Sequence, residues 1–239
     1  MGKGISGNAL KMIAAAAMLT DHAGAVLIEV GILGPALFMD SAEVPDALLP
    51  WLLADALLRL VGRIAFPIFC YLLAEGFCHT RNAGTYALRL LVFAVISEIP
   101  FDLALFDTWF YPGYQSVYVT LLLGLLLLMT LKRVGDGGAP WKKIAAVVGF
   151  GAAAQLLKCD YGAFGTTLIA LFYFTRKNRR MQTICACLAL IWEVTAPLAL
   201  IPIRMYNGTR GKARLKYGFY AFYPLHLLVL WGLRLWLIG

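Results

Sequence analysis

Charged residues are scarce in this chain of 239 residues, and the scarcity limits what kind of protein it is. Asp, Glu, Lys and Arg make up 14% of the sequence, against about 25% in a typical soluble domain. Apolar residues make up 61%, and the mean hydropathy is +0.77. Nearly charge-free runs occupy residues 64–77, 117–131, 144–157 and 163–175. This balance excludes an ordinary soluble domain and indicates lipid as the solvent.

The sequence also lacks the period-two alternation of a transmembrane β-barrel. Its apolar segments are separated by short polar loops, which is typical of helices that cross a bilayer several times. We therefore predict an all-α fold, a polytopic transmembrane helical bundle that forms a single integral membrane domain over residues 1–239. The eight expected membrane segments cover residues 9–30, 60–78, 87–105, 116–131, 144–158, 161–175, 183–203 and 217–237.

Two further absences concern cysteines and processing. The chain has five cysteines, an odd number, without a repeated C-x-x-C framework, so a disulfide scaffold or a metal site is not indicated. We predict that the cysteines are small buried packing residues. No small-residue cleavage pattern follows the first apolar stretch, so we expect this stretch to be retained as the first membrane span.

Basic residues predict the orientation. Loops 132–143 and 176–180 are rich in Lys and Arg, loop 79–86 is weakly basic, and loop 107–115 has no base. By the positive-inside rule, the N-terminus is cytoplasmic. These loops largely account for the net charge of +8, so no nucleic-acid partner is expected. Residues 48–60 predict a helix lying in the membrane interface.

The segment 183–203 does not fit this order. A single crossing would place Arg204, Arg210, Lys212, Arg214 and Lys216 outside the cell. Either the positive-inside rule is violated, or the segment, which contains Glu193 and two prolines, enters the membrane and returns as two half-helices. We favour the second alternative, because a cytoplasmic basic loop also suits an anionic ligand.

Ionisable residues inside the predicted spans are candidate functional residues, since each charge at a helix centre costs about 2.5–3.5 kcal/mol. Glu98 and Asp102 are four residues apart on one helix face and flank Pro100. Arg63 either neutralises this acidic pair or binds a substrate. Asp160 and Tyr161 lie in a turn, where Asp is an ordinary residue.

Lys11 and His22 are separated by 11 positions, which is about 16 Å along a helix. One helix therefore places a cation near the cytoplasm and an imidazole, next to Asp21, near mid-span. A long substrate with an anionic end and a buried reactive end fits these two points. Acetyl-coenzyme A has this shape.

The sequence resembles the TraX family, membrane proteins linked to conjugation and to N-acetylation of pilin. The resemblance is carried, in family order, by residues 10–26 (LKMIAAAAMLTDHAGAV), 58–82, 88–106, 158–176 and 205–230. The first helix is also similar to that of the membrane acyltransferases of family 3, in which a basic residue precedes a histidine with ten residues between them. Here that pattern is Lys11, MIAAAAMLTD, His22, with Lys in place of the commoner Arg.

These resemblances imply a multi-pass protein of the bacterial inner membrane that transfers acetyl from cytoplasmic acetyl-CoA, with His22 as general base or as nucleophile. Asp21, Glu98, Asp102 or Glu193 would orient the imidazole, and His226 is a second mid-membrane imidazole that could take part in catalysis. Candidates for the CoA phosphates are Lys11, Arg81, Arg210, Lys212, Arg214 and Lys216. Candidates for the acceptor are Arg63, Asp102, Asp160 and Tyr161.

The acceptor is left open by the sequence: an amine or a hydroxyl of a pilin, a surface molecule or an exported molecule. Membrane lipids and acetyl-CoA are the other expected partners, and a homo-oligomer is compatible with the sequence. Two alternatives use other features. A proton-coupled transporter also needs intramembrane Asp, Glu and His residues, and a non-enzymatic assembly subunit needs none of this chemistry.

Overall fold

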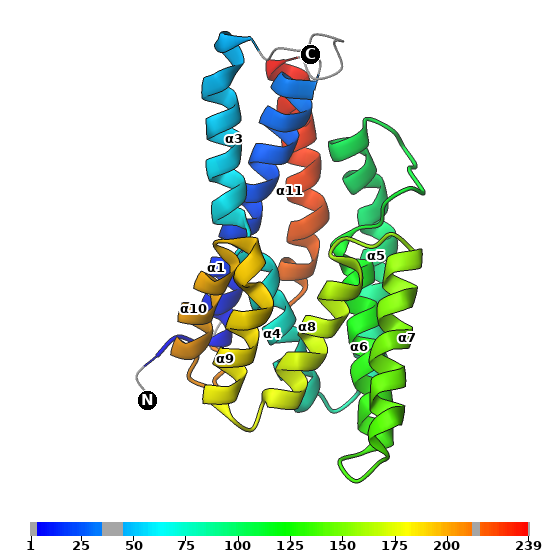
Figure 1. Ribbon diagram of the computed structural model, residues 1–239. Coiled ribbons are helices and arrows are strands. Elements are labelled where there is room, and N and C mark those ends of the chain that lie inside the picture. The colour runs from blue at the N-terminus through cyan, green and yellow to red at the C-terminus, as the bar shows by residue number, and fades with distance from the viewer. Residues whose placement is uncertain (1–3, 35–44, 212–215, 239) are drawn as a thin grey trace.

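The computed structural model describes residues 4–34, 45–211 and 216–238 (Figure 1). Within these ranges the regular structure is helical, with two isolated β-bridges as the remaining backbone pairings. The predicted all-α fold is confirmed. The helices pack lengthwise into one bundle, with α1 beginning at one end and α11 ending at the other (Figure 1). These ends are called the N-terminal end and the far end below.

The helices follow one another with short connections. In chain order they are α1 (Gly7–Ala23), η1 (Gly24–Leu33), η2 (Asp46–Leu48), α3 (Leu49–Gly62), α4 (Ala65–His79), α5 (Ala83–Phe106), α6 (Val117–Val134), α7 (Pro140–Leu156), α8 (Gly162–Thr175), α9 (Arg179–Leu190), η3 (Ile191–Glu193), η4 (Ala196–Ala199), α10 (Leu200–Met205) and α11 (Lys216–Leu237).

Three helical stretches are long and apolar enough to cross a membrane, judged by length and composition: Gly7–Leu33, Asp46–His79 and Val117–Val134. Two shorter apolar helical stretches are Gly162–Thr175 and Ala196–Met205. In the first stretch, α1 is capped by Ser6, whose hydroxyl accepts a hydrogen bond from the amide of Ala9, and it continues directly into the wider π-helical turns of η1. The count of eight membrane segments stays a prediction.

The predicted interfacial helix at residues 48–60 is present as α3, but its expected placement is wrong. Instead of lying across the bundle, α3 runs along α1 and η1 and joins α4 through a break at residues 63–64 (Figure 1). Its apolar side chains include exposed Leu53 and Leu57. The face of α3 that packs against α1 and η1 is half-buried, with Gly62 fully buried, and this packing outweighs the interfacial preference that its aromatic content suggested.

The segment 183–203 forms two half-helices, α9 and α10, joined by the 3₁₀ turns η3 and η4. Its two ends lie together: Nη2 of Arg179 donates to the carbonyl of Tyr206 over 3.3 Å, and Arg204 donates to Thr183. Tyr206 also pairs with Ile5, just before α1. The half-helix hairpin that we favoured is what the structure has, with both ends at the N-terminal end of the bundle (Figure 1).

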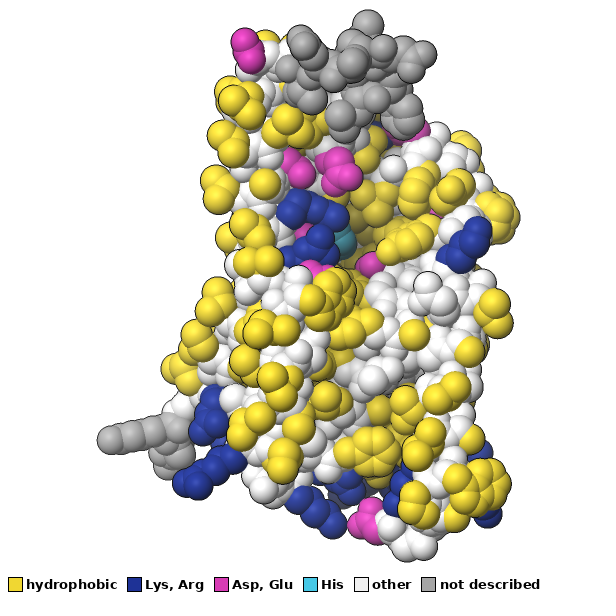
Figure 2. Space-filling model, in the orientation of Figure 1, with side chains coloured by type: hydrophobic (Ala, Val, Ile, Leu, Met, Phe, Trp, Pro, Cys, Tyr) yellow, Lys and Arg dark blue, Asp and Glu magenta, His cyan; other side chains and the backbone are white. Residues whose placement is uncertain are grey.

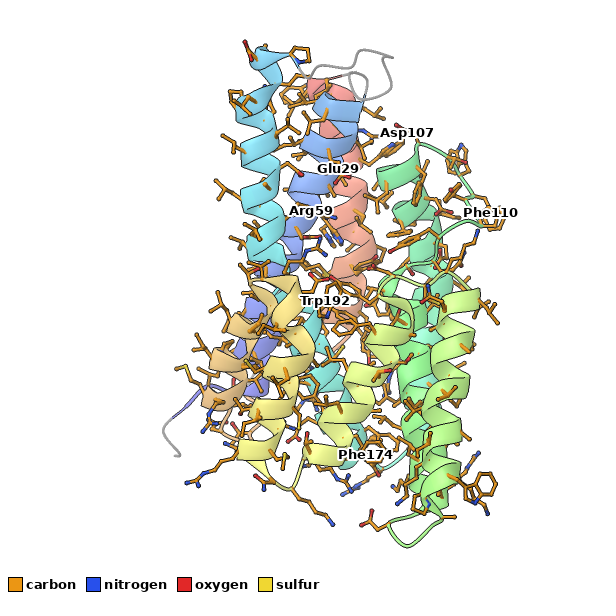
Figure 3. All side chains as sticks on the ribbon, in the orientation of Figure 1. Glu29, Arg59, Asp107, Phe110, Phe174 and Trp192 are labelled. Carbon is orange, nitrogen blue, oxygen red and sulfur yellow. The ribbon has the colours of Figure 1, made fainter. Side chains whose placement is uncertain are left out.

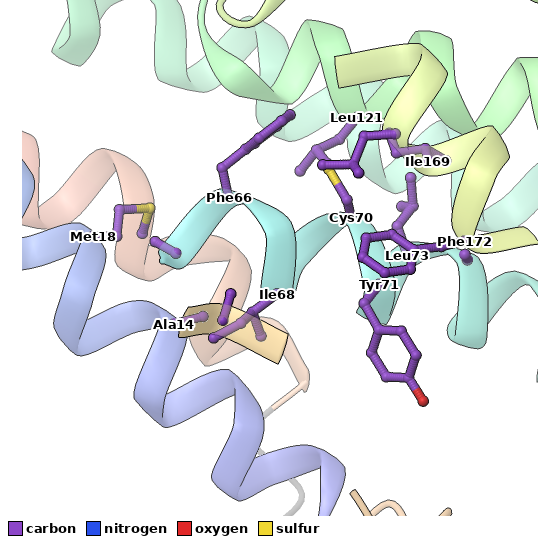
Figure 4. Packing of buried hydrophobic residues seen from close by; sticks show 14 of the residues in the cluster. Ala14, Met18, Phe66, Ile68, Cys70, Tyr71, Leu73, Leu121, Ile169 and Phe172 are labelled. Atoms are coloured by element: carbon purple, nitrogen blue, oxygen red, sulfur yellow. The ribbon is translucent and has the colours of Figure 1, made fainter. Parts of the chain in front are cut away.

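Helix α4 lies at the centre of the core, where it packs against α1, α6 and α8. Its side chains Ile68, Cys70 and Leu73 meet residues of these neighbours (Figure 4). Cys70 and Cys159 are buried as predicted, whereas Cys78 is exposed, because it lies near the end of α4. All five cysteines are free thiols.

Candidate active site

Two histidines meet where α1 packs against α11. Nδ1 of His22 lies 2.6 Å from Nε2 of His226. Nδ1 of His226 lies 2.7 Å from the carbonyl oxygen of Phe222, one turn earlier on α11. Tyr223 places its ring edge-on to both imidazoles, with ring centroids 5.7 Å from each.

These contacts assign the protons of the pair. A carbonyl oxygen only accepts, so His226 carries its proton on Nδ1 and has a lone pair on Nε2. His22 must then donate from Nδ1 to that lone pair, which leaves Nε2 of His22 unprotonated. An imidazole with one nitrogen held as a donor and the other free is arranged to accept a proton.

On the N-terminal side of the pair lies a cavity of about 440 Å³. It is called the basic cavity here, because Lys11, Arg89, Arg210 and His79 line it, with Glu75 as the acid among its lining residues. Lys11 and Arg89 are held by aromatic rings: Nζ of Lys11 is 5.4 Å from the ring centre of Phe219, and the guanidinium of Arg89 is 5.7 Å from that of Tyr86.

On the far side of the pair lies a cavity of about 310 Å³. It is called the mixed-charge cavity here, because both acidic and basic side chains line it. These charged residues come from α1, η1, the end of α3 and the α7–α8 turn, and they are Asp21, Glu29, Arg59, Arg63 and Asp160. Figure 3 labels Glu29 and Arg59, which lie one above the other on this side of the bundle.

A small cavity of about 40 Å³ lies between the two. It shares Phe69 with the basic cavity, and it shares Asp21, His22, Asp160 and Tyr161 with the mixed-charge cavity. The three cavities therefore follow one another through the bundle, and His22 lines the last two.

Ion pairs fix the lining of the mixed-charge cavity. Arg59 pairs with two carboxylates. Its Nη1 is 2.7 Å from Oδ2 of Asp21, and its Nε is 3.9 Å from Oε2 of Glu29. Nε of Arg63 is 3.3 Å from Glu193, which reaches it from the tip of the α9–α10 hairpin. Asp21 is thus bound to an arginine and does not orient His22, the role that its position in the sequence had suggested.

Asp160 receives a different partner. The hydroxyl of Tyr114 donates to its Oδ1 over 3.1 Å, and Asp160 makes no ion pair with the described residues. Burial raises the pKa of Asp160 to about 6. Its carboxyl is therefore mostly ionised at pH 7 and neutral at pH 5.

The other predicted carboxylates are bound away from His22. Glu98 accepts from the amide and hydroxyl of Ser116 over 3.2 and 2.8 Å, and Asp102 accepts from the amide of Tyr111 over 2.8 Å. Asp102 therefore holds the middle of the α5–α6 connection, and Glu98 holds its end. The predicted pairing of Arg63 with this acidic pair is wrong, because Arg63 binds Glu193.

The predicted phosphate-binding residues divide into three groups. Lys11 and Arg210 line the basic cavity. Arg81 is exposed and is not among the residues that line it. Lys212, Arg214 and the side chain of Lys216 lie outside the described residues.

Three charged residues of these cavities were missed from the sequence: Arg59, Arg89 and Glu29. Arg89 lies inside the predicted span 87–105, so the rule that intramembrane charges mark functional sites would have found it. Glu29 likewise lies inside the predicted span 9–30, whereas Arg59 belongs to a helix whose neighbours the sequence does not reveal. Among the described residues, no group of three His, Cys, Asp or Glu side chains is placed to hold a metal ion.

The fold and the site together define a helical membrane protein in which a histidine pair, with His226 buried and His22 half-buried, lies between two charged cavities. The chain belongs to the TraX protein family, whose family model matches residues 6–234. This confirms the resemblance to TraX that was drawn from the sequence, and the similarity to the membrane acyltransferases of family 3 stays a prediction. A relative is the probable fimbrial assembly protein FimC, serogroup H1, of Dichelobacter nodosus, which is 32% identical over 210 residues, covering 75% of this chain and 84% of the relative. No solved structure matches the chain.

Proposed function

We propose that this protein is a membrane acetyltransferase that moves acetyl from acetyl-CoA in the basic cavity to an acceptor in the mixed-charge cavity. The observation that carries the proposal is the free Nε2 of His22, held by the contact with His226 at the junction of the cavities. The N-terminal end of the bundle would face the cytoplasm of the inner membrane, where acetyl-CoA is present.

The basic cavity suits the donor in charge and size. Lys11, Arg89 and Arg210 would bind the phosphates of CoA, since charge-assisted hydrogen bonds to phosphate are the strong ones. Its volume of about 440 Å³ is in the range of small-molecule sites. The pantetheine arm would pass Phe69 and bring the thioester to the small cavity beside His22.

The chemistry follows from the proton positions. The acceptor amine or hydroxyl attacks the thioester carbonyl while Nε2 of His22 takes its proton, a role that typically contributes 10²–10⁴-fold in rate. The tetrahedral intermediate collapses, the C–S bond breaks, and the CoA thiolate takes the proton back from His22. In the covalent alternative, Nε2 attacks first and forms an acetyl-imidazole that the acceptor resolves. His226 is a positioning residue in both routes.

The family and the relative guide the choice of acceptor. The relative's name places it in fimbrial assembly, so a pilin or another exported surface molecule is the acceptor that we propose. Reaction through opposite cavities would let the donor stay on one side of the membrane while the acceptor approaches from the other.

The test is acetyl-CoA binding to, and turnover by, purified protein in nanodiscs. We expect Lys11→Ala to weaken acetyl-CoA binding, and His22→Ala to bind acetyl-CoA normally but to transfer no acetyl. Lys142→Ala, an exposed lysine on α7, is the matched control and should behave as wild type. Absence of saturable binding in folded wild-type protein would refute the proposal. Trapping of labelled acetyl on wild type but not on His22→Ala would select the covalent route.

A non-enzymatic role in assembly is the second candidate, and the name of the relative favours it. The same preparation separates the two. An assembly subunit would keep its function in cells carrying His22→Ala, whereas an acetyltransferase would lose it. A transporter would move a solute into sealed vesicles, and counterflow measures this directly.

A further inference from the structure

The mixed-charge cavity opens on the side of the bundle. Its lining comes from η1, α3 and α5, and both α3 and α5 pack against η1. In Figure 2, with the bundle axis vertical, the side that faces the viewer is hollowed between these helices, and Lys or Arg and Asp or Glu side chains gather in the hollow. The opening therefore faces the surroundings of the bundle rather than only its far end.

The surface around this opening is apolar. Hydrophobic side chains cover both sides of the hollow and the area below it (Figure 2). Trp192, at the tip of the α9–α10 hairpin, is 60% exposed, and Val194 is 74% exposed. A hydrogen bond from the hydroxyl of Thr195 to the carbonyl of Leu60 holds this tip against α3. The tip therefore forms the lower border of the hollow. A molecule that reaches the hollow from the side must therefore pass an apolar border.

The charge of the hollow selects what can enter. Three carboxylates, Asp21, Glu29 and Asp160, and two guanidiniums, Arg59 and Arg63, line the cavity. Arg63 is neutralised by a further carboxylate, Glu193, so carboxylates exceed guanidiniums by four to two. An uncharged lipid chain would leave this excess of negative charge uncompensated, whereas a cation would neutralise part of it, because buried charges need compensation.

We propose that the acceptor enters sideways between α3 and α5, and that it is a primary amine carried on an apolar chain that stays in the hydrocarbon. The ammonium would rest among the excess carboxylates of the cavity, and its apolar chain would leave past Trp192. This inference rests on the proposed function for its chemistry, but the binding site does not depend on it. The carrier of the amine is either an acyl chain or an apolar peptide.

The proton balance is complete without a further reactant. The ammonium gives one proton to the cavity carboxylates, which pass it to water, and becomes a neutral amine. That amine attacks the thioester, and Nε2 of His22 takes the second proton and returns it to the leaving thiolate. One amide, one free CoA thiol and one proton result from one ammonium and one acetyl-CoA.

The experiment compares primary amines with and without an apolar anchor, in nanodiscs that hold the full chain. Dodecylamine and an apolar peptide with a free N-terminus are the anchored probes, and glycinamide is the soluble one. Binding is measured without acetyl-CoA, and turnover is measured with it. Val30→Trp narrows the opening, since Val30 lines the cavity. Val148→Trp, on exposed α7, is the matched control.

We expect at least one anchored amine to bind and be acetylated at least tenfold more efficiently than glycinamide. Val30→Trp should lower its binding at least fivefold, and Val148→Trp should leave it unchanged. The two anchored probes show which carrier is used. Equal use of glycinamide would overturn the sideways entry and leave the acetyltransferase standing. Binding of an anchored amine that Val30→Trp weakens, without any acetylation, would support the entry site and refute the enzymatic role.

Discussion

Replacing His226 by Gln and, separately, by Asn isolates the contact that orients His22. The amide oxygen of Gln reaches the place of Nε2 of a histidine, and can accept from Nδ1 of His22 as His226 does over 2.6 Å. The shorter Asn places its oxygen near Nδ1 instead, where it cannot reach His22. The two variants remove the same imidazole and differ in whether His22 keeps its acceptor.

The size of the effect follows from one hydrogen bond. A buried bond between neutral groups contributes about 0.5–1.5 kcal/mol, which corresponds to a factor of about 2 to 12 in the population of the reactive tautomer. We expect His226→Asn to lower kcat by about this factor, and His226→Gln to stay within twofold of wild type. Loss of His22 itself should cost far more, about 10²–10⁴-fold.

The assay is acetyl transfer from labelled acetyl-CoA, together with thermal unfolding of each variant in detergent. If His226 had a structural role alone, its replacement would lower Tm and activity in parallel. The Gln and Asn variants would then have equal activity whenever their Tm values were equal. Equal, wild-type rates for both variants would refute the assignment of the proton on Nδ1 of His22.

Three further predictions concern the cavities and the packing around them. Arg89→Ala should raise KM for acetyl-CoA tenfold or more, as expected for loss of a charged contact of about 1.5–3 kcal/mol; an unchanged KM would remove Arg89 from the donor site. Gly62→Ala should lower unfolding stability by about 1–3 kcal/mol, because its Cβ would lie 2.2 Å from that of Asp21, whereas Gly149→Ala, with open space around it, should not. Binding of dodecylamine should weaken below pH 6 as Asp160 protonates, and Asp160→Asn should abolish that dependence; a dependence that persists would assign it to another group.

The elements that could be predicted from the sequence are those that depend on local pattern. Lys11 and His22 lie on one helix, because one nearly uninterrupted apolar run continues from one to the other. The half-helix hairpin at residues 183–203 could be predicted because a single crossing would place the five bases that follow it outside the cell, which the positive-inside rule disfavours.

The partners of the charged residues could not be predicted in the same way. Asp21 is adjacent to His22 in sequence but points to Arg59, about 100° around the helix axis, and Arg63 binds Glu193 across 130 positions of the chain. Such pairings depend on which helices become neighbours. The same holds for His226, whose contact with His22 joins the first and last helices.

The first turn of α1 is held by a segment from the other end of the chain. The amides of Ile5, Gly7 and Asn8 donate to the carbonyls of Met205, Thr209 and Arg210. At a synthesis rate of about 5–20 residues per second, these amides are made roughly 10–40 s before the carbonyls that accept their hydrogen bonds. The wall of the basic cavity that holds Arg210 forms at the same late moment. A nascent chain stalled before residue 205 would therefore carry His22 already inserted but would have no complete pocket for an anionic ligand, so that the protein becomes competent only when its biosynthesis is almost finished.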